Sequence, residues 1–166
     1  GGTIRNDDTA VLILAAIDAE KEEGTGGTAT EFTFRVVLTA DVQGGLDVAY
    51  TTDDGSAAVA DGDYVDNDGT LDFTGFAGEF YDLTVLVNHD DKVEDDELFA
   101  VALGAISNIN PLIDLATISQ AGTPADGTIV NDDPALFSID SVLLDEGSSG
   151  VTAFVFTVTL SNPSQL

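Results

Sequence analysis

A short acidic stretch, NHDDKVEDDELF at residues 88–99, carries the side chains with the clearest capacity for chemistry. Half of its residues are carboxylic acids: Asp90, Asp91, Glu94, Asp95, Asp96 and Glu97. Asp90 lies four residues before Glu94, and Glu97 lies three residues after it, so a tight loop could turn all three carboxylates inward. Carboxylates held that close repel one another unless a cation lies between them. The stretch is therefore either a solvated acidic face or a site for a hard divalent cation.

Three further acidic segments could join this loop: EKEEG at 20–24, TTDDG at 51–55 and NDD at 131–133. Ca²⁺ takes about six to eight oxygen ligands, mostly carboxylates and carbonyls. Alternate turns of an antiparallel sandwich lie at the same end, so acidic segments at strand ends can meet. DNDGT at 66–70 does not continue as an EF-hand loop, and we interpret it as a β-turn. The spacing predicts a shared calcium site, and acidic loops that only adapt the protein to salt are the alternative.

Composition excludes several functions. The chain has 166 residues, of which four are Lys or Arg and 31 are Asp or Glu, so its formal net charge is −27. Four cations cannot build the basic patch that nucleic acids require, and anionic membrane surfaces are disfavoured for the same reason. There is no Cys and one His, which excludes thiolate chemistry and multi-histidine metal sites. Nor does the sequence contain an apolar run of about 18 residues, so membrane insertion is not expected.

Catalysis is also not expected. Paired carboxylates can hydrolyse glycosides when one acts as the acid and the other as the base or nucleophile. Nothing in the sequence indicates a cleft with these two separate roles, and no aromatic platform for a sugar is evident. We therefore predict that the protein is not an enzyme.

Alternating apolar residues predict β-strands throughout the chain. The period-two runs are rich in Val, Phe, Thr and Leu and cover residues 32–38, 46–50, 71–73, 81–87 and 99–103. Gly- and Asp-rich turns separate them. About seven short strands with such turns are typical of a β-sandwich. Residues 104–124 are predicted to form a long connection.

An internal repeat divides the chain. GTIRNDDTAVL at 2–12 recurs as GTIVNDDPALF at 127–137, an offset of 127 − 2 = 125 residues, and EEGTGGTATEFTFRVVLT at 22–39 recurs as DEGSSGVTAFVFTVTLS at 145–161. The repeat predicts three parts: residues 1–8 end a preceding repeat, 9–133 form a complete domain, and 134–166 open a following repeat. The outer parts lack most of their sheets, so we expect them to be marginal or to pair with another chain.

The order of the motifs resembles the Calx-beta domain family, which is known from sodium–calcium exchangers and from tandem arrays in bacterial surface proteins. TTDDGSAAVADGDYVDNDGTLDF is followed by an apolar strand, by NHDDKVEDDELFAVAL and by GTIVNDD. The likeness covers about residues 9–133 and recurs in the flanking fragments. It implies an all-β fold, a seven-stranded immunoglobulin-like antiparallel β-sandwich with partial repeats at both ends. It also implies a calcium cluster at one end, near the junction with the next repeat.

The resemblance further implies which residues hold calcium. The positions that match family ligands are Glu23, Asp54, Asp90, Glu94, Glu97, Asp132 and Asp133, with Asp91 as an adjacent contributor and the carbonyl of Lys92 as a backbone ligand. Asn131 stands where the family has its first terminal aspartate, and it offers an oxygen without a charge. One ion is therefore expected to be lost or bound more weakly. The side chains would support about one or two Ca²⁺ ions.

Other polar residues are expected to lie outside a complete site. His89 is predicted to be an exposed flank of the acidic loop, because Ca²⁺ seldom takes imidazole. Asn6, Asp7 and Asp8 repeat the terminal motif and Glu146 repeats the position of Glu23, but their other ligands are missing.

These observations predict a non-enzymatic calcium-binding structural repeat of a large extracellular or cell-surface protein, with a role in adhesion or matrix building. The expected partners are calcium ions and neighbouring repeats or copies of the same chain. One alternative is a subunit of a self-assembling extracellular fibre. Another is a sandwich that binds an extracellular partner or a polysaccharide through Phe76, Phe80 and Tyr81, with acidic loops that serve only salt adaptation.

Overall fold

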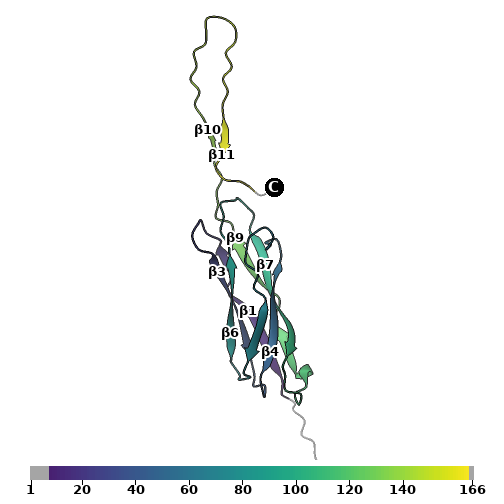
Figure 1. Cartoon of the computed structure of the whole chain (residues 1–166). Coiled ribbons are helices and arrows are strands. Elements are labelled where there is room, and N and C mark those ends of the chain that lie inside the picture. The colour runs from purple at the N-terminus through teal and green to yellow at the C-terminus, as the bar shows by residue number, and fades with distance from the viewer. Residues whose placement is uncertain (1–7, 165–166) are drawn as a thin grey trace, which may run out of the picture.

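The computed structural model describes residues 8–164, which form a two-sheet β-sandwich and a separate hairpin (Figure 1). One sheet has the order β6-β3-β1-β8, formed by Phe80–Val87, Thr30–Leu38, Ala10–Asp18 and Ile118–Ala121. The other has the order β2-β9-β7-β4-β5, formed by Glu20–Glu22, Ala125–Val130, Glu97–Ser107, Leu46–Asp54 and Gly69–Phe73. The predicted all-β sandwich is confirmed, while Asn6 and Asp7 lie outside the described residues.

Aromatic side chains from both sheets fill the core of the sandwich. Phe32 and Phe34 of β3 contact Phe99 of β7, with ring centroids 5.7 and 5.9 Å apart. Tyr64 stacks on the same ring at 4.8 Å. Gly127 of β9 lies opposite Phe99, and a Cβ there would come within 2.5 Å of the ring. Position 127 therefore requires glycine, because any side chain there would collide with the ring of Phe99.

The first extended segment of the sandwich, β1 and β2, and the last, β8 and β9, each contribute one strand to each sheet. β1 pairs with β3 whereas β2 pairs with β9, and β8 pairs with β1 whereas β9 also pairs with β7. Counted with each divided strand as one, the sandwich has the seven extended segments that were predicted. The long connection predicted at 104–124 is wrong, because β7 continues to Ser107 through its pairing with β4, and η1 (Leu115–Thr117) leads into β8. No helix within residues 8–164 is long and apolar enough to cross a membrane.

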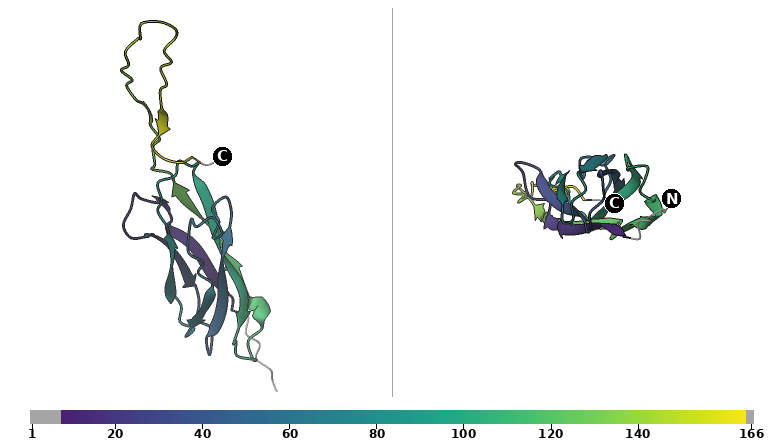
Figure 2. Two further views of the ribbon diagram at one scale, coloured as in Figure 1. Left: turned by 45° about the horizontal axis from the view of Figure 1, so that its top comes forward. Right: turned by 90° about the horizontal axis from the view of Figure 1, so that it is seen from below.

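A hairpin follows the sandwich and projects from one of its ends (Figure 2). It contains the antiparallel strands β10 (Phe137–Ile139) and β11 (Val158–Leu160). Phe137 faces Leu160 across the hairpin. The sequence repeat assigns these residues to the positions of Leu12 and Leu38, which face each other between β1 and β3. The hairpin therefore has the strand register of the first hairpin of the sandwich.

Two hydrogen bonds of the first hairpin of the sandwich also recur at matching positions in the hairpin that follows the sandwich. In the sandwich, Thr30 Oγ1 donates to the carbonyl of Glu23 at 2.7 Å, and in the hairpin Thr152 Oγ1 donates to the carbonyl of Glu146 at 2.6 Å. A second matching pair, at 2.9 Å in each case, joins Val11 to Thr39 and Leu136 to Ser161. The repeated sequence thus folds locally in the same way twice.

The two hairpins differ in what covers their apolar face. In the sandwich, the core-facing residues are at most 2% exposed: Leu12, Leu14, Phe32, Phe34, Val36 and Leu38. Their counterparts in the hairpin are 37–78% exposed: Phe137, Ile139, Phe154, Phe156, Val158 and Leu160. Residues 134–164 therefore present half of a core, without the second sheet that buries the equivalent face in the sandwich.

Candidate metal centre

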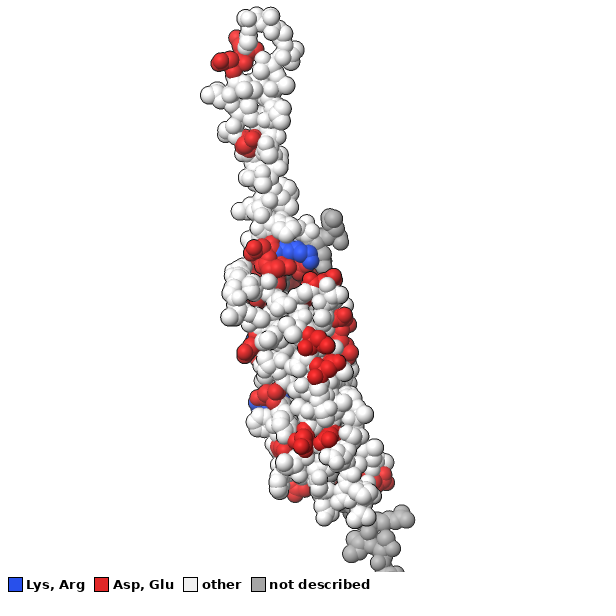
Figure 3. Space-filling view, in the orientation of Figure 1, with Lys and Arg blue, Asp and Glu red and all other residues white. Residues whose placement is uncertain are grey.

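Three neighbouring strands bring the acidic segments to one end of the sandwich. β2 and β9 are parallel, with Glu22 beside Val130, so both end at the same edge of the sheet. β7 runs antiparallel to β9, with Glu97 opposite Ile129, so it begins at that edge. Acidic side chains are dense at this end, whereas the hairpin above it carries few charges (Figure 3). The segments that follow β2 and β9 and the loop that precedes β7 therefore meet.

Glu23, Asp132 and Asp133 form what we call the terminal cluster. One carboxylate oxygen of each lies within 4.8 Å of the others. Glu23 and Asp133 are buried and Asp132 is half-buried. Asp132 Oδ1 and Asp133 Oδ2 are buried and have no hydrogen-bond partner among the described residues. Burying carboxylate oxygens without a donor costs free energy of folding, and a bound cation would remove that cost.

Asp63, Glu94 and Glu97 form a second group, the loop cluster, with ligand atoms again within 4.8 Å of one another. Glu94 and Glu97 were predicted ligands. Asp63 was not predicted, although its neighbour Tyr64 was part of the motif that carried the family resemblance. Because both clusters offer only carboxylate oxygens, their chemistry suits a hard cation such as Ca²⁺.

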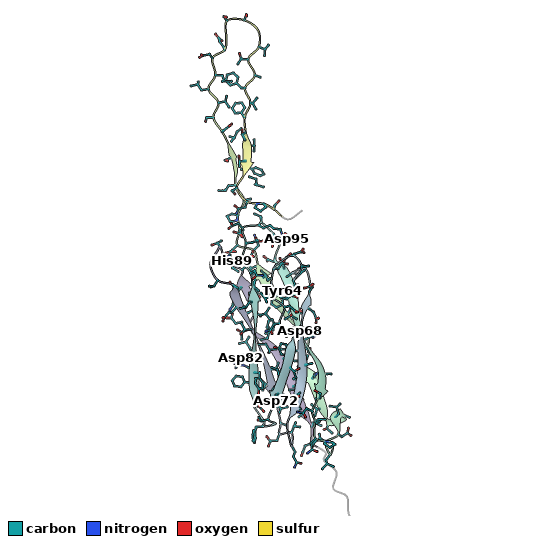
Figure 4. The ribbon with its side chains drawn as sticks, in the orientation of Figure 1. Tyr64, Asp68, Asp72, Asp82, His89 and Asp95 are labelled. Carbon is teal, nitrogen blue, oxygen red and sulfur yellow. The ribbon has the colours of Figure 1, made fainter. Side chains whose placement is uncertain are left out.

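Asp63 reaches the loop cluster because Tyr64 fixes the chain beside it. Tyr64 forms an isolated β-bridge with Val87 at the end of β6 and packs its ring on Phe99. Tyr64 lies near the acidic end, close to His89 and Asp95 of the loop (Figure 4). The position of Asp63 thus depends on a long-range aromatic contact, which no local sequence spacing indicates.

A lysine serves the loop cluster as a counter-ion. Lys92 Nζ forms an ion pair with Glu94 Oε1. Asp90 Oδ1 accepts the backbone N–H of Lys92 at 2.6 Å, which shapes the loop between them. The hydrogen bond with Glu94 raises the pKa of Lys92, so its ammonium group persists through neutral pH. None of the ion pairs within residues 8–164 reaches the terminal cluster.

Carboxyl pKa values show how strongly charge is concentrated at this end. Burial, followed by the charges of Asp90, Glu94, Asp133 and Asp132, raises the pKa of Glu23 to about 7. The pKa of Asp133 is also raised, first by burial and then by the charges of Asp132, Asp91 and Asp90. The acidic loop and the terminal cluster therefore act on each other electrostatically.

Asn131 ties the loop to the terminal segment. Its Oδ1 accepts the backbone N–H of Glu94 at 3.3 Å, and its own backbone N–H donates to Asp96 Oδ1 at 3.2 Å. Asn131 is outside both clusters, and so are Asp90 and Asp91, although the charges of both aspartates act on the terminal cluster. The uncharged side chain at position 131 thus has a structural role between the two acidic segments.

Asp54 lies apart from the clusters. Its Oδ1 accepts hydrogen bonds from Tyr64 O–H at 2.7 Å and from the backbone N–H of Val59 at 3.0 Å. These bonds, that from Tyr64 first, lower the pKa of Asp54. In this structure Asp54 supports the segment that carries Asp63.

His89 is half-buried, so the prediction of an exposed flank is wrong. Its Nδ1 is buried and has no hydrogen-bond partner among the described residues. The physical reason is that the neighbouring residue, Asn88, forms two hydrogen bonds to residues 62–63. Its backbone N–H donates to the Asp63 carbonyl at 2.9 Å, and its side-chain Nδ2–H donates to the Gly62 carbonyl at 2.6 Å. These bonds pull the start of the loop against residues 62–63.

The three aromatic residues considered for polysaccharide binding have different environments. Phe76 is 71% exposed, on the turn between β5 and β6 at the end away from the clusters. The Arg35 guanidinium lies 4.2 Å from the ring centroid of Phe80. Tyr81 donates its O–H to the Asp72 carbonyl. Because adjacent strand residues point to opposite faces, Phe80 and Tyr81 cannot form one flat platform.

Comparison with known proteins agrees with this geometry. The Calx-beta domain model matches residues 17–133, so the chain belongs to the Calx-beta domain family. The solved apo form of the Calx CBD1 domain is 26% identical with a TM-score of 0.59, over 76% of this chain and 100% of that one. CBD12 from CALX1.2 is 27% identical with a TM-score of 0.56, over 73% of this chain and 44% of that one.

A third similar structure, the calcium binding domain CBD12 of CALX1.1, is 27% identical with a TM-score of 0.52, over 72% of this chain and 44% of that one. This chain thus spans less than half the length of either CBD12 structure. No curated protein matches the sequence. The family predicted from the motifs is confirmed, and its match ends at Asp133, the last residue of the terminal cluster.

Proposed function

We propose that this chain is a non-enzymatic calcium-binding structural repeat of a large extracellular or cell-surface protein. The observation that carries the proposal is the terminal cluster, where buried oxygens of Asp132 and Asp133 lie beside Glu23 without a donor among the described residues. One of the similar solved structures is described as a calcium binding domain. A bound calcium ion would supply the positive charge that these three carboxylates lack.

The same residues would stiffen the junction that follows the sandwich. Pro134 comes directly after Asp133, and its carbonyl accepts a hydrogen bond from Asn162 Nδ2 at 3.1 Å. The backbone N–H of Val93, inside the acidic loop, donates to the Pro163 carbonyl at 2.9 Å. Both ends of the hairpin are therefore attached to the segments that carry the carboxylates, so ordering those segments orders the hairpin base. Adhesion or matrix building is the role that such a stiffened repeat would serve.

The proposal extends to a tandem array. Residues 134–166 would open a following repeat, and residues 1–8 would end a preceding one. The register and the hydrogen bonds that the hairpin shares with the first hairpin of the sandwich support this assignment. Glu146 then takes the place of Glu23 in the next domain.

Hydrogen exchange tests the proposed stiffening in the full chain. Amides in residues 88–97 and 131–133, including that of Val93, should exchange more slowly in calcium than in chelator. Magnesium should not reproduce the protection at equal concentration, because it demands smaller and more regular coordination. The variant Asp132→Asn/Asp133→Asn should lose the calcium-dependent protection. Equal exchange with and without calcium in the unmodified chain would contradict the proposal.

A second candidate, self-assembly, is favoured by the uncovered apolar face of the hairpin. Six uncharged residues on that face could pack against a second copy, and only Asp140, Asp145 and Glu146 bring charge to residues 134–166. Sedimentation velocity over a range of concentrations tests it. Association should weaken in Phe154→Ser/Phe156→Ser and persist in Leu136→Ser/Val155→Ser, which removes apolar side chains from the other face. A monomer at all concentrations would exclude this candidate.

A further inference from the structure

Lys92 occupies an unusual place for a cation, inside the loop that carries the candidate calcium ligands. Its Nζ contacts Glu94 Oε1, and the side chain of Glu94 is 8% exposed. Asp90 and Asp63 add to the negative field at Lys92. Asp63 and Glu94 are two of the three members of the loop cluster. The ammonium group therefore lies at the cluster where a calcium ion would also be attracted.

The other cations are bound elsewhere. Within the described residues, Lys21 pairs with Asp18 at 2.6 Å and Arg35 pairs with Asp82 at 2.6 Å. Both of those carboxylates are outside the two clusters. Among the ion pairs of residues 8–164, the pair formed by Lys92 is thus the one whose carboxylate belongs to a candidate metal cluster.

We propose that Lys92 is a tethered cation that competes with calcium for Glu94, so that the loop cluster binds calcium more weakly than the terminal cluster. The inference rests on the proposed calcium binding and assigns a regulator to it. Before calcium binds, the ion pair holds the loop in its folded shape by neutralising one buried carboxylate. When calcium binds at the loop cluster, Glu94 exchanges one cation for another and Lys92 turns toward solvent.

Two consequences follow for the order of binding. The terminal cluster has no ion pair to break, so calcium binds there first. The loop cluster fills at higher calcium concentration, because part of its attraction for calcium is already satisfied by the lysine. Because of Lys92, calcium binds to the two clusters in two separate steps and not at one concentration.

The matched test compares Lys92→Met with Lys21→Met in the full, chelator-treated chain. Both substitutions remove one positive charge and keep a long apolar side chain, but Lys21 has its partner outside the clusters. By calorimetry, Lys92→Met should tighten the weaker calcium step about fivefold, the upper end expected for an ion pair whose lysine is partly exposed. Lys21→Met should change it by less than about twofold. Equal changes in both variants, or none in Lys92→Met, would overturn the inference.

Two readouts separate this inference from the proposed function. In chelator, Lys92→Met should lower the midpoint of thermal unfolding by about 3 °C more than Lys21→Met, because the loop loses its counter-ion. The chain contains two lysines, so ¹³C-labelled lysine gives two side-chain signals, and calcium should shift that of Lys92 while Lys21 serves as the reference. If the unmodified chain binds no calcium, the proposed function fails and so does competition by Lys92. If calcium binds but the Lys92 signal does not move, only the inference about Lys92 fails.

Discussion

The two carboxylate clusters lie at one end of the same sandwich, yet they handle negative charge differently. In the terminal cluster, two buried oxygens have no donor among the described residues and the pKa of Glu23 is raised to about 7. In the loop cluster, Lys92 pairs with Glu94. In the terminal cluster, repulsion between the buried carboxylates destabilises the folded chain. In the loop cluster, the ammonium group of Lys92 partly neutralises the corresponding repulsion. The distance between carboxylates is therefore not enough to rank two sites by their affinity for a cation. A neighbouring counter-ion also matters, because it reduces the attraction of the carboxylates for calcium.

The largest effect is expected when the terminal cluster loses its charge. Asp132→Asn/Asp133→Asn should weaken the tighter calcium step by about a hundredfold, since two of its three carboxylates disappear. Calorimetry measures this directly. Asp72→Asn/Asp126→Asn removes the same charge from exposed strand positions and should change the affinity by less than about threefold. Similar losses in both variants would mean that net charge, and not the cluster, attracts calcium.

Acidification should affect the terminal cluster next most strongly. Because Glu23 takes up a proton near pH 7, calcium must displace that proton below pH 7, and the apparent affinity should fall by about tenfold per pH unit. Calcium titrations at pH 8, 7 and 6 measure the slope. Glu23→Gln should bind more weakly and flatten the pH dependence. An affinity in the unmodified chain that does not change over this range would contradict the assignment of Glu23.

The same pKa fixes the sign of the stability change without calcium. The folded chain keeps a proton on Glu23 up to about pH 7, whereas the ordinary value of 4.5 applies when the chain unfolds. The folded state therefore binds more protons between these values, and the free energy of unfolding falls as pH rises from about 5 to 7. Chemical denaturation in chelator measures the fall, which should be smaller in Glu23→Gln. A free energy of unfolding that rises over this interval, independently of Glu23, would oppose the expected sign.

A smaller effect is expected from the loop cluster. Glu94→Ala/Glu97→Ala should abolish the weaker calcium step and reduce the tighter one by about tenfold, because Glu94 contributes to the field at Glu23. Asp63→Asn should weaken only the weaker step. If the double variant instead abolished all binding, the two clusters would be one inseparable site.

The smallest effect on binding is expected at Asp54. Asp54→Asn should change calcium affinity by less than about threefold, because this carboxylate accepts hydrogen bonds from Tyr64 and Val59 and is outside both clusters. It should lower the free energy of unfolding, because the amide accepts a weaker hydrogen bond from Tyr64 than the carboxylate does. Loss of calcium binding in this variant would instead place Asp54 among the ligands, as the family resemblance implies.

Much of the fold could be predicted from the sequence because burial alternates along the strands. Phe32, Phe34, Val36 and Leu38 are all buried, and this period of two is what the sequence pattern shows. The extension of β7 to Ser107 could not be predicted in this way. Its last residues are largely exposed and are defined by pairing with β4, which leaves no alternation of apolar residues to detect.

The candidate site could be predicted only where its residues occupy strand ends. Glu23, Glu97 and Asp133 were predicted, and they adjoin β2, begin β7 and follow β9. Asp63 was missed because its position depends on the packing of Tyr64 against Phe99, far along the chain. Long-range packing and side-chain pairing therefore decide which acidic residues of a plausible loop share a site.

The most direct test of calcium binding at these clusters is a calcium titration of the chelator-treated full chain by isothermal calorimetry, in about 0.15 M salt. We predict saturable binding of about one or two ions, in two steps if both clusters fill, with the tighter step lost in Asp132→Asn/Asp133→Asn. Magnesium at the same concentration should give little heat. No saturable binding at millimolar calcium would contradict the proposed calcium binding and leave the two clusters as an acidic surface adapted to salt.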